Sequence, residues 1–249
     1  MDLQGKDRLI VALDLPDHEA ALEAVDVLDN VFFFKIGYHL LLTGRVLELL
    51  EKIQEDRAGQ GGVFIDFKLP GDIDDTIKGF IRSCLSLNVK LLTLDAGTAN
   101  SKTARAISII QEARGESEDP RIIMVPMLSS LDADDLELFE GEHCGATRYI
   151  VDRGRKLLEY GCDGLVVSGE AIKTCRESFP NCMIVSPGIR PTGFPTQDHK
   201  RYTTPAEAIR YGADYLVVGR PVLQAKNRWQ AAQDIISEID RESTHSQFT

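Results

Sequence analysis

Two opposite charges stand two residues apart in an apolar run that begins at Val63 and reads VFIDFKL. If this run is a strand, Asp66 and Lys68 point to the same face, because successive side chains of a strand alternate between faces. Lys35 ends an earlier apolar run, and Asp72 follows soon after Lys68. An alternating array of these four charges would favour the ammonium form of Lys68 and keep a proton available. Such an array suits a reaction that creates carbanion character and then protonates it.

A second group of residues could hold a phosphate. Gly188 is followed closely by Arg190, and Gly219 is followed directly by Arg220. Glycine lets backbone N–H groups approach an anion, and arginine adds a bidentate, charge-assisted contact. The two pairs follow the last two apolar runs of the chain, and barrel enzymes often bind phosphate in the loops after strands seven and eight.

Other chemistries have no matching pattern. No Ser-His-Asp or Cys-His arrangement for acyl transfer is present. The five histidines are scattered without metal-ligand spacing, and apart from His199 they are expected at the surface: His18, His39, His143 and His245. The five cysteines match no zinc or redox motif and are expected to be buried or free thiols in a reducing compartment: Cys84, Cys144, Cys162, Cys175 and Cys182.

Eight short apolar runs, rich in β-branched residues, alternate with helical patterns along the chain. The runs are almost continuously apolar, which is typical of parallel strands that are covered on both faces. They begin at Leu9, Val31, Val63, Leu91, Ile122, Leu165, Met183 and Tyr215.

Amphipathic helices are expected between the runs. Apolar residues recur at helical spacing in two clear cases: Val46, Leu49, Leu50 and Ile53, and again Trp229, Ala232, Ile236 and Ile239. Asp17 and the pair Thr204-Pro205 have the residue types that begin helices. Residues 130–160 make a segment longer than one barrel helix, so two helices are expected there.

Eight strand–helix units in 249 residues predict one domain, residues 1–249, folded as a (β/α)8 TIM barrel. An open, doubly wound sheet is the alternative. In a barrel the strand ends converge on the face that carries active sites. Polar or glycine-rich positions mark the end of every run: Asp14, Lys35, Asp66, Lys68, Asp95, Ser129, Ser168, Gly188, Arg190, Gly219 and Arg220. A ring of this kind indicates a functional site more than isolated structural ion pairs.

The charge balance limits the partners. With 39 acidic and 28 basic side chains, the net charge of −11 argues against nucleic acid or an anionic membrane as a partner. A local basic patch can still hold one phosphate. No apolar run approaches the roughly 20 residues of a membrane span, and the polar start of the chain does not resemble a secretory signal. A cytoplasmic protein is therefore expected.

These same residues carry a resemblance to the orotidine 5′-monophosphate decarboxylase family. Residues 66–76, DFKLPGDIDDT, resemble its signature D-x-K-x-x-D-I-x-x-T. Residues 12–14 and 35–37 are similar to the ends of its first two strands, residues 186–193 to its phosphate loop, and residues 218–221 to its last strand. The similarity covers nearly the whole chain, in order.

The resemblance implies a barrel of the ribulose-phosphate-binding type that converts orotidine 5′-monophosphate to UMP without metal or cofactor. It implies that Lys68 donates a proton to C6 of the pyrimidine, that Asp66 lies against the substrate carboxylate, and that Lys35 orients Asp66 and a ribose hydroxyl. Asp14 would bind the ribose, and Ser129 would touch the pyrimidine.

The resemblance further implies a homodimer with shared active sites, in which three residues reach into the partner's site: Asp72, Ile73 and Thr76. The phosphate would be held by Arg190, Gly219 and Arg220.

The chain departs from the family pattern at three places. Three residues, 69–71, separate Lys68 from Asp72 where the family has two, so the extra residue must bulge, which Gly71 permits. Asp95 stands where the family usually has histidine. His199 stands where many members place a phosphate-binding glutamine, with Gln197 close by.

Two other functions remain open at this point. One is a metal-dependent aldolase or decarboxylase that acts on a sugar phosphate, on the same barrel. Its third-strand motif usually reads D-x-K-T-x-D, whereas Leu69 follows Lys68 here, and Ile73 and Thr76 favour the pyrimidine enzyme. The other is a non-catalytic protein that binds a phosphorylated metabolite.

Overall fold

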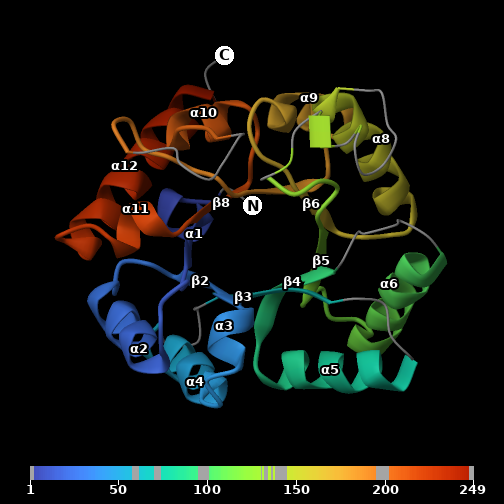
Figure 1. Ribbon diagram of the computed structural model, residues 1–249, viewed down its shortest axis with the longest axis horizontal. Coiled ribbons are helices and arrows are strands. Elements are labelled where there is room, and N and C mark those ends of the chain that lie inside the picture. Colours follow the sequence, from blue (N-terminus) through green and yellow to red (C-terminus); the bar gives the residue numbers. More distant parts are fainter. Residues whose placement is uncertain are drawn as a thin grey trace.

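The computed structural model describes residues 3–57, 62–69, 74–94, 101–129, 131, 134–135, 137, 145–194 and 202–246. Eight parallel strands form a closed barrel in the order β1 to β8 (Figure 1). They are β1 (Leu9–Ala12), β2 (Phe33–Gly37), β3 (Gly62–Leu69), β4 (Val89–Leu94), β5 (Arg121–Met124), β6 (Gly164–Val166), β7 (Met183–Ser186) and β8 (Tyr215–Val218). The predicted barrel is confirmed, and the open sheet is wrong because β1 pairs with both β2 and β8.

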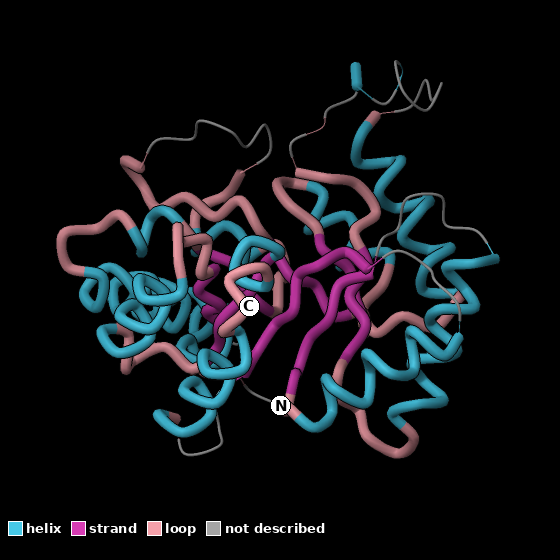
Figure 2. Tube along the Cα trace, turned by 60° about the horizontal axis from the view of Figure 1, so that its bottom comes forward, coloured by secondary structure: helices cyan, strands magenta, loops and turns pink. Residues whose placement is uncertain are grey.

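Helices surround the strands on the outside, with the strands at the centre (Figure 2). They are α1 (Gly5–Arg8), α2 (His18–Val27), α3 (Tyr38–Leu41), α4 (Val46–Asp56), α5 (Asp74–Ser86), α6 (Ser101–Arg114), α8 (Ala146–Glu159), α9 (Ala171–Ser178), α10 (Pro205–Arg210), α11 (Arg220–Leu223) and α12 (Arg228–Ser246). The second helix expected within residues 130–160 falls largely outside the described residues.

The predicted helix starts have the expected chemistry. Asp17 accepts a hydrogen bond from the backbone N–H of Ala20 at 2.8 Å, which satisfies one of the free donors at the start of α2. Thr204 and Glu207 form a reciprocal capping box, and Pro205 occupies the first turn of α10.

Trp229 differs from the other residues of its predicted apolar stripe. It is 38 % exposed and donates its indole N–H to Asp29.

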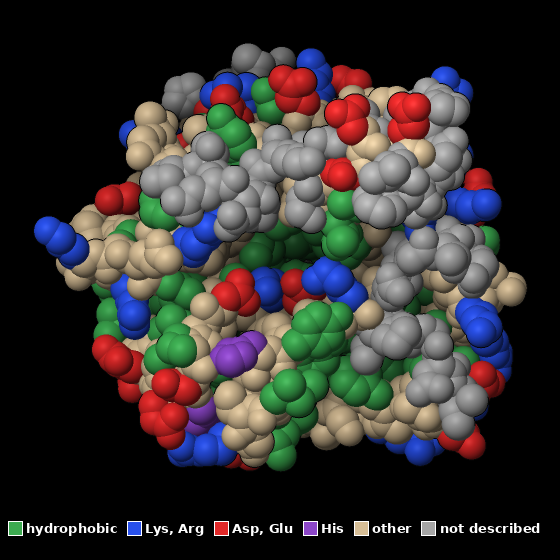
Figure 3. Space-filling model, in the orientation of Figure 1, with side chains coloured by type: hydrophobic (Ala, Val, Ile, Leu, Met, Phe, Trp, Pro, Cys, Tyr) green, Lys and Arg blue, Asp and Glu red, His purple; other side chains and the backbone are tan. Residues whose placement is uncertain are grey.

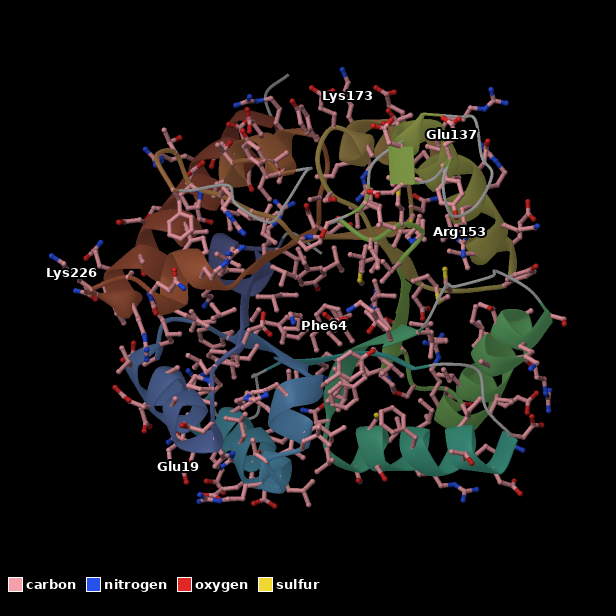
Figure 4. The ribbon with its side chains drawn as sticks, viewed as in Figure 1. Glu19, Phe64, Glu137, Arg153, Lys173 and Lys226 are labelled. Atoms are coloured by element: carbon pink, nitrogen blue, oxygen red, sulfur yellow. The ribbon has the colours of Figure 1, made fainter. Side chains whose placement is uncertain are left out.

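The barrel has two apolar layers because side chains of each strand alternate between its inside and its outside. Among the described residues, side chains of the strands fill the inside: Ile10, Ala12, Phe33, Phe64, Leu91, Ile123, Val185 and Val217. In Figure 4, Phe64 lies near the centre of the barrel, whereas Glu19, Lys173 and Lys226 lie at the outside of the surrounding helices. A larger cluster, which includes Leu9 and Val11, packs between the strands and the helices.

Two equivalent ion pairs fasten strands at the N-terminal end of the barrel. Asp163 accepts hydrogen bonds from Arg114 and from the N–H of Ile122 at the start of β5. Asp214 does the same two strands later, with Arg176 and the N–H of Ile184. The N-terminal end of a TIM barrel contributes to stability, and the C-terminal end carries the active site. These ion pairs therefore stiffen the scaffold at the end away from the chemistry.

Buried polar residues include one that the sequence analysis misplaced. His18 is 2 % exposed rather than a surface residue, and its Nε2 lies 3.5 Å from the Glu48 carboxylate of α4.

The four described cysteines are buried free thiols, as expected: Cys84, Cys162, Cys175 and Cys182. Burial raises the pKa of the Cys175 thiol to about 11, so this group stays protonated and unreactive at neutral pH. Among the described helices, none combines the length and the apolar character needed to cross a membrane.

Candidate active site

A pocket of about 450 Å³ opens at the C-terminal ends of the strands. Its floor is the upper part of the barrel interior, where Ala12, Phe64, Val185 and Val217 present apolar side chains. Figure 3 shows this hollow with an apolar interior and with acidic and basic side chains along its edge. An apolar pocket with a few convergent polar groups is the usual form of a small-molecule site.

Four predicted residues form a chain of alternating charges at one side of the pocket. The ammonium of Lys35 lies 3.3 Å from Asp14 Oδ1 and 3.3 Å from Asp66 Oδ2. The ammonium of Lys68 donates to Asp66 Oδ1 at 2.9 Å. Lys35 and Asp66 are the most enclosed, with 12 % and 16 % of their side chains exposed, whereas Asp14 is 64 % exposed. Three members of the array that the sequence predicted, Lys35, Asp66 and Lys68, are therefore brought together by β2 and β3, and Asp14 joins them from the segment after β1. The fourth predicted member, Asp72, lies outside the described residues.

The central carboxylate stays ionised despite its burial. Burial acts to raise the pKa of Asp66, but the charges of Lys35 and Lys68 and hydrogen bonds from Lys68 and Thr93 hold that pKa below its ordinary value. The two lysines thus stabilise a carboxylate that would otherwise be costly to desolvate.

Strand β3 bulges where it carries these charges. Ile65 pairs with Leu92 of β4 and Leu69 pairs with Leu94, so three residues of β3 lie opposite Thr93 alone. Lys68 has a φ of 47°, in the left-handed region that residues other than glycine seldom adopt. The Thr93 hydroxyl accepts from the Lys68 N–H at 3.0 Å and donates to Asp66 Oδ1 at 2.9 Å. Sequence reasoning missed Thr93, although a lone hydroxyl within the apolar run LLTL was a signal.

The predicted phosphate residues line the same pocket beside Asp14, because they follow β7 and β8, and β8 pairs with β1. Gly188 has a φ of 76°, which only glycine adopts without strain, and it leads into Arg190 after β7. Arg190 is 5 % exposed, and its guanidinium donates to the carbonyl of Ile189 at 2.8 Å. Gly219 follows β8 and Arg220 begins α11, and both line the pocket. Two arginines and two glycines therefore converge on one region, as an anion site requires.

Ser129 also lines the pocket, in the segment that follows β5. The structure adds residues that the predicted site did not include, such as Ser168 after β6, Met127, and Gln224 after α11. Ser168 is 3 % exposed, and its sequence position identifies it only as a polar strand end.

Some predicted residues are not placed in the pocket. Five of them lie outside the described residues: Asp72, Ile73, Asp95, Gln197 and His199. Of the three residues between Lys68 and Asp72, only Leu69 is described. Thr76 is exposed on the first turn of α5 and is not among the residues that line the pocket of its own chain. Asp74, next along from Ile73, forms an ion pair with Arg105 of α6 instead.

A second hollow, of about 530 Å³, adjoins the first on the side of α3. Asp14, Lys35, Asp66 and Lys68 line both hollows, so the charged array is accessible from two directions. Within the described ranges, His, Cys, Asp and Glu side chains form no group of three or more that could hold a metal ion.

Comparison with known proteins gives one consistent result. The family model described as "Orotidine 5'-phosphate decarboxylase / HUMPS family" matches residues 7–235. A protein of Rhodopseudomonas palustris (strain BisB5) named orotidine 5′-phosphate decarboxylase is 42 % identical over 240 residues, which are 96 % of this chain and 97 % of that protein. A protein of Nitrobacter winogradskyi with the same name is 40 % identical over 237 residues, which are 94 % of this chain and 93 % of the relative.

Solved structures share the fold. The crystal structure of orotidine 5′-phosphate decarboxylase from Lactobacillus acidophilus superimposes with a TM-score of 0.75 at 24 % identity, covering 93 % of this chain and 98 % of that one.

Proposed function

Because the chain belongs to the orotidine 5′-phosphate decarboxylase / HUMPS family, we propose that its barrel pocket decarboxylates orotidine 5′-monophosphate with Lys68 as the proton donor. The protein converts this nucleotide to UMP, the last step of de novo pyrimidine biosynthesis. The observation that carries the mechanism is the chain of charges from Asp14 through Lys35 and Asp66 to Lys68 at the edge of an apolar pocket.

The reaction breaks the bond between C6 of the pyrimidine and its carboxylate. The bonding electrons stay on C6 while CO2 leaves, and the Lys68 ammonium then gives its proton to C6, after which solvent reprotonates the amine. Asp66 lies beside Lys68 and faces the substrate carboxylate, so loss of that carboxylate's charge removes a repulsion. Preorganised charges of this kind lower the barrier most when they act away from bulk water. No metal or cofactor enters the proposed steps.

The order of strands around the barrel supports a nucleotide as the substrate. The phosphate residues follow β7 and β8, Asp14 follows β1, and Lys35, Asp66 and Lys68 belong to β2 and β3. Phosphate, ribose and reacting base would therefore meet neighbouring strands in the order in which a nucleotide links them. Ser129 would contact the pyrimidine from the segment after β5. The same proposal assigns phosphate binding to His199 or Gln197, and treats residues 1–249 as one catalytic domain.

We extend the proposal to a cytoplasmic homodimer with shared sites. Hydrophobic side chains are exposed on and beside α3, namely Tyr38 at 54 %, Leu41 at 41 % and Leu42 at 86 % (Figure 3). Exposed apolar groups that cluster on one face are typical of a protein interface. The second hollow lies beside α3, so a partner held on this face could supply Asp72, Ile73 and Thr76 to the array from that side.

Subunit complementation tests the shared site. Lys68→Ala and Asp72→Ala dimers are each expected to be inactive, but a heterodimer would have one site with both changes and one site with neither. Random mixing of equal amounts makes about half of the dimers heterodimers, so exchange should restore roughly a quarter of wild-type activity. The measurement is decarboxylation of orotidine 5′-monophosphate before and after subunit exchange.

Exchange itself is followed with a tag on one variant. If tagged heterodimers form and no activity returns, Asp72 acts within its own subunit or has no role. The missing carboxylate would then be sought in Asp75, because Asp74 is engaged by Arg105.

A further inference from the structure

A bulge in β3 places two of the proposed reacting groups, and it has to be held in shape. Residues 66–68 face a single residue of β4, so the regular ladder between the two strands is interrupted there. Lys68 also has a left-handed backbone conformation, which is strained for a residue other than glycine. Such a conformation persists only where surrounding contacts enforce it.

Thr93 supplies those contacts with one hydroxyl group. It accepts a hydrogen bond from the backbone N–H of Lys68 and donates a hydrogen bond to Asp66 Oδ1. A hydroxyl can donate once and accept at the same time, so the two bonds do not compete. The link fixes the bulge through the backbone of Lys68 and fixes the carboxylate of Asp66, to which the Lys68 ammonium also binds.

The position of Thr93 favours this role over simple core packing. Its side chain is 0 % exposed between Leu92 and Leu94, where a hydroxyl is unfavourable unless it has partners. Both of its partners belong to the charged array. Valine has nearly the same shape and would pack here without any hydroxyl.

We propose that Thr93 is a positioning residue, whose hydroxyl holds the β3 bulge and the Asp66 carboxylate in the geometry that the reaction uses. This inference rests on the proposed function of Asp66 and Lys68. Thr93 does not line the pocket formed by the described residues, so it acts through those two groups rather than on the substrate.

The inference gives a pH-dependent signature. The described groups that face Asp66 are Lys35 from β2, Lys68 from β3 and Thr93 from β4, and Asp14 faces Lys35 from the end of β1. Burial raises the pKa of Asp66, the two lysines lower it, and the Thr93 hydrogen bond adds to the lowering. Without the hydroxyl this pKa rises towards its ordinary value. Because the ionised carboxylate is the active form, activity should then be lost at a higher pH as the solution is acidified.

The test compares Thr93→Val, which replaces the hydroxyl by a methyl group, with Thr93→Ser, which keeps the hydroxyl. Thr93→Val is expected to lower kcat about 10- to 100-fold, since small misplacements of reacting groups have effects of this size. KM for orotidine 5′-monophosphate should change less than about threefold, because the phosphate residues are untouched. The acidic limb of kcat/KM should move to higher pH. Thr93→Ser should retain kcat within about threefold and keep the wild-type limb.

Two results would overturn the inference: Thr93→Val with wild-type kcat and pH profile, or Thr93→Ser as impaired as Thr93→Val. Circular dichroism checks folding, and Thr93→Ala carries the same expectation if the valine variant does not fold. Failure of the proposed function is distinguishable: if the protein does not catalyse the reaction, the wild type shows no turnover, and if Lys68 is not the proton donor, Lys68→Ala remains active. A neutral Thr93→Val beside an inactive Lys68→Ala would refute the role of Thr93 alone.

Discussion

Lys68→Ala is expected to lower kcat for orotidine 5′-monophosphate by at least about 10²- to 10⁴-fold, the usual contribution of a general acid. In the described part of the chain, Lys68 is the cation that pairs with Asp66 from the same strand, and it lines both hollows. Alanine leaves no group there to protonate C6. It also leaves Asp66 with Lys35 and Thr93 as partners, so the variant should fold.

Lys90→Ala is a matched control for this variant. Lys90 also belongs to a barrel strand, is about one-third exposed, and pairs with an aspartate, Asp119, at 2.9 Å, but it lies at the opposite end of the barrel. Its replacement should leave kcat unchanged. Steady-state kinetics and thermal melts of both variants give the comparison. A Lys68→Ala enzyme with substantial kcat would remove Lys68 from the mechanism.

Arg220→Ala is expected to lower kcat/KM for orotidine 5′-monophosphate about 10- to 100-fold. A charge-assisted hydrogen bond contributes about 1.5–3 kcal/mol, and each 1.4 kcal/mol corresponds to a factor of ten. Part of the loss should appear in kcat at saturation, because binding energy from a remote phosphate can stabilise the transition state more than the ground state. KM should rise as well.

The unphosphorylated nucleoside separates phosphate binding from other effects. Wild type and Arg220→Ala should act on orotidine with similar, low efficiency, since neither can use a phosphate contact. Arg210→Ala, which removes an exposed arginine paired with Glu242 on the outside of α10, should behave as wild type with both compounds. If the wild type handles orotidine and its monophosphate equally well, the phosphate site is not where Gly188, Arg190, Gly219 and Arg220 place it.

The sequence was sufficient for the fold because each strand is buried on both faces and each helix on one. Buried strands require continuous apolar runs, and half-buried helices require apolar residues at helical spacing. Both patterns are visible in the sequence, so all eight strands were predicted, for example β3 from VFIDFKL and β8 from YLVVGRP. Barrel closure then follows from eight consecutive units. The convergence of Asp14, Lys35, Asp66 and Lys68 was also predictable, because parallel strands bring their ends to one face.

Features that depend on a partner across space were not predictable. Thr93 acts through a bulge of the neighbouring strand, and a bulge changes the register without leaving a clear periodic signal. His18 directly follows the residue that caps α2, a position that is usually exposed. In the fold its side chain is buried and lies near Glu48 of α4. Trp229 fits the apolar stripe of its helix, but its side chain is partly exposed and its indole N–H donates a hydrogen bond to Asp29.

The most direct test of the account is an absorbance assay of the purified protein with orotidine 5′-monophosphate in the presence of excess EDTA. The account predicts full turnover to UMP that is unchanged by the chelator, because the Lys35–Asp66–Lys68 array supplies the charge and the proton. Turnover that disappears with EDTA and returns with a divalent metal would contradict it and favour a metal-dependent sugar-phosphate enzyme on the same barrel. Binding of the nucleotide without any turnover would contradict it equally and indicate a non-catalytic binding protein.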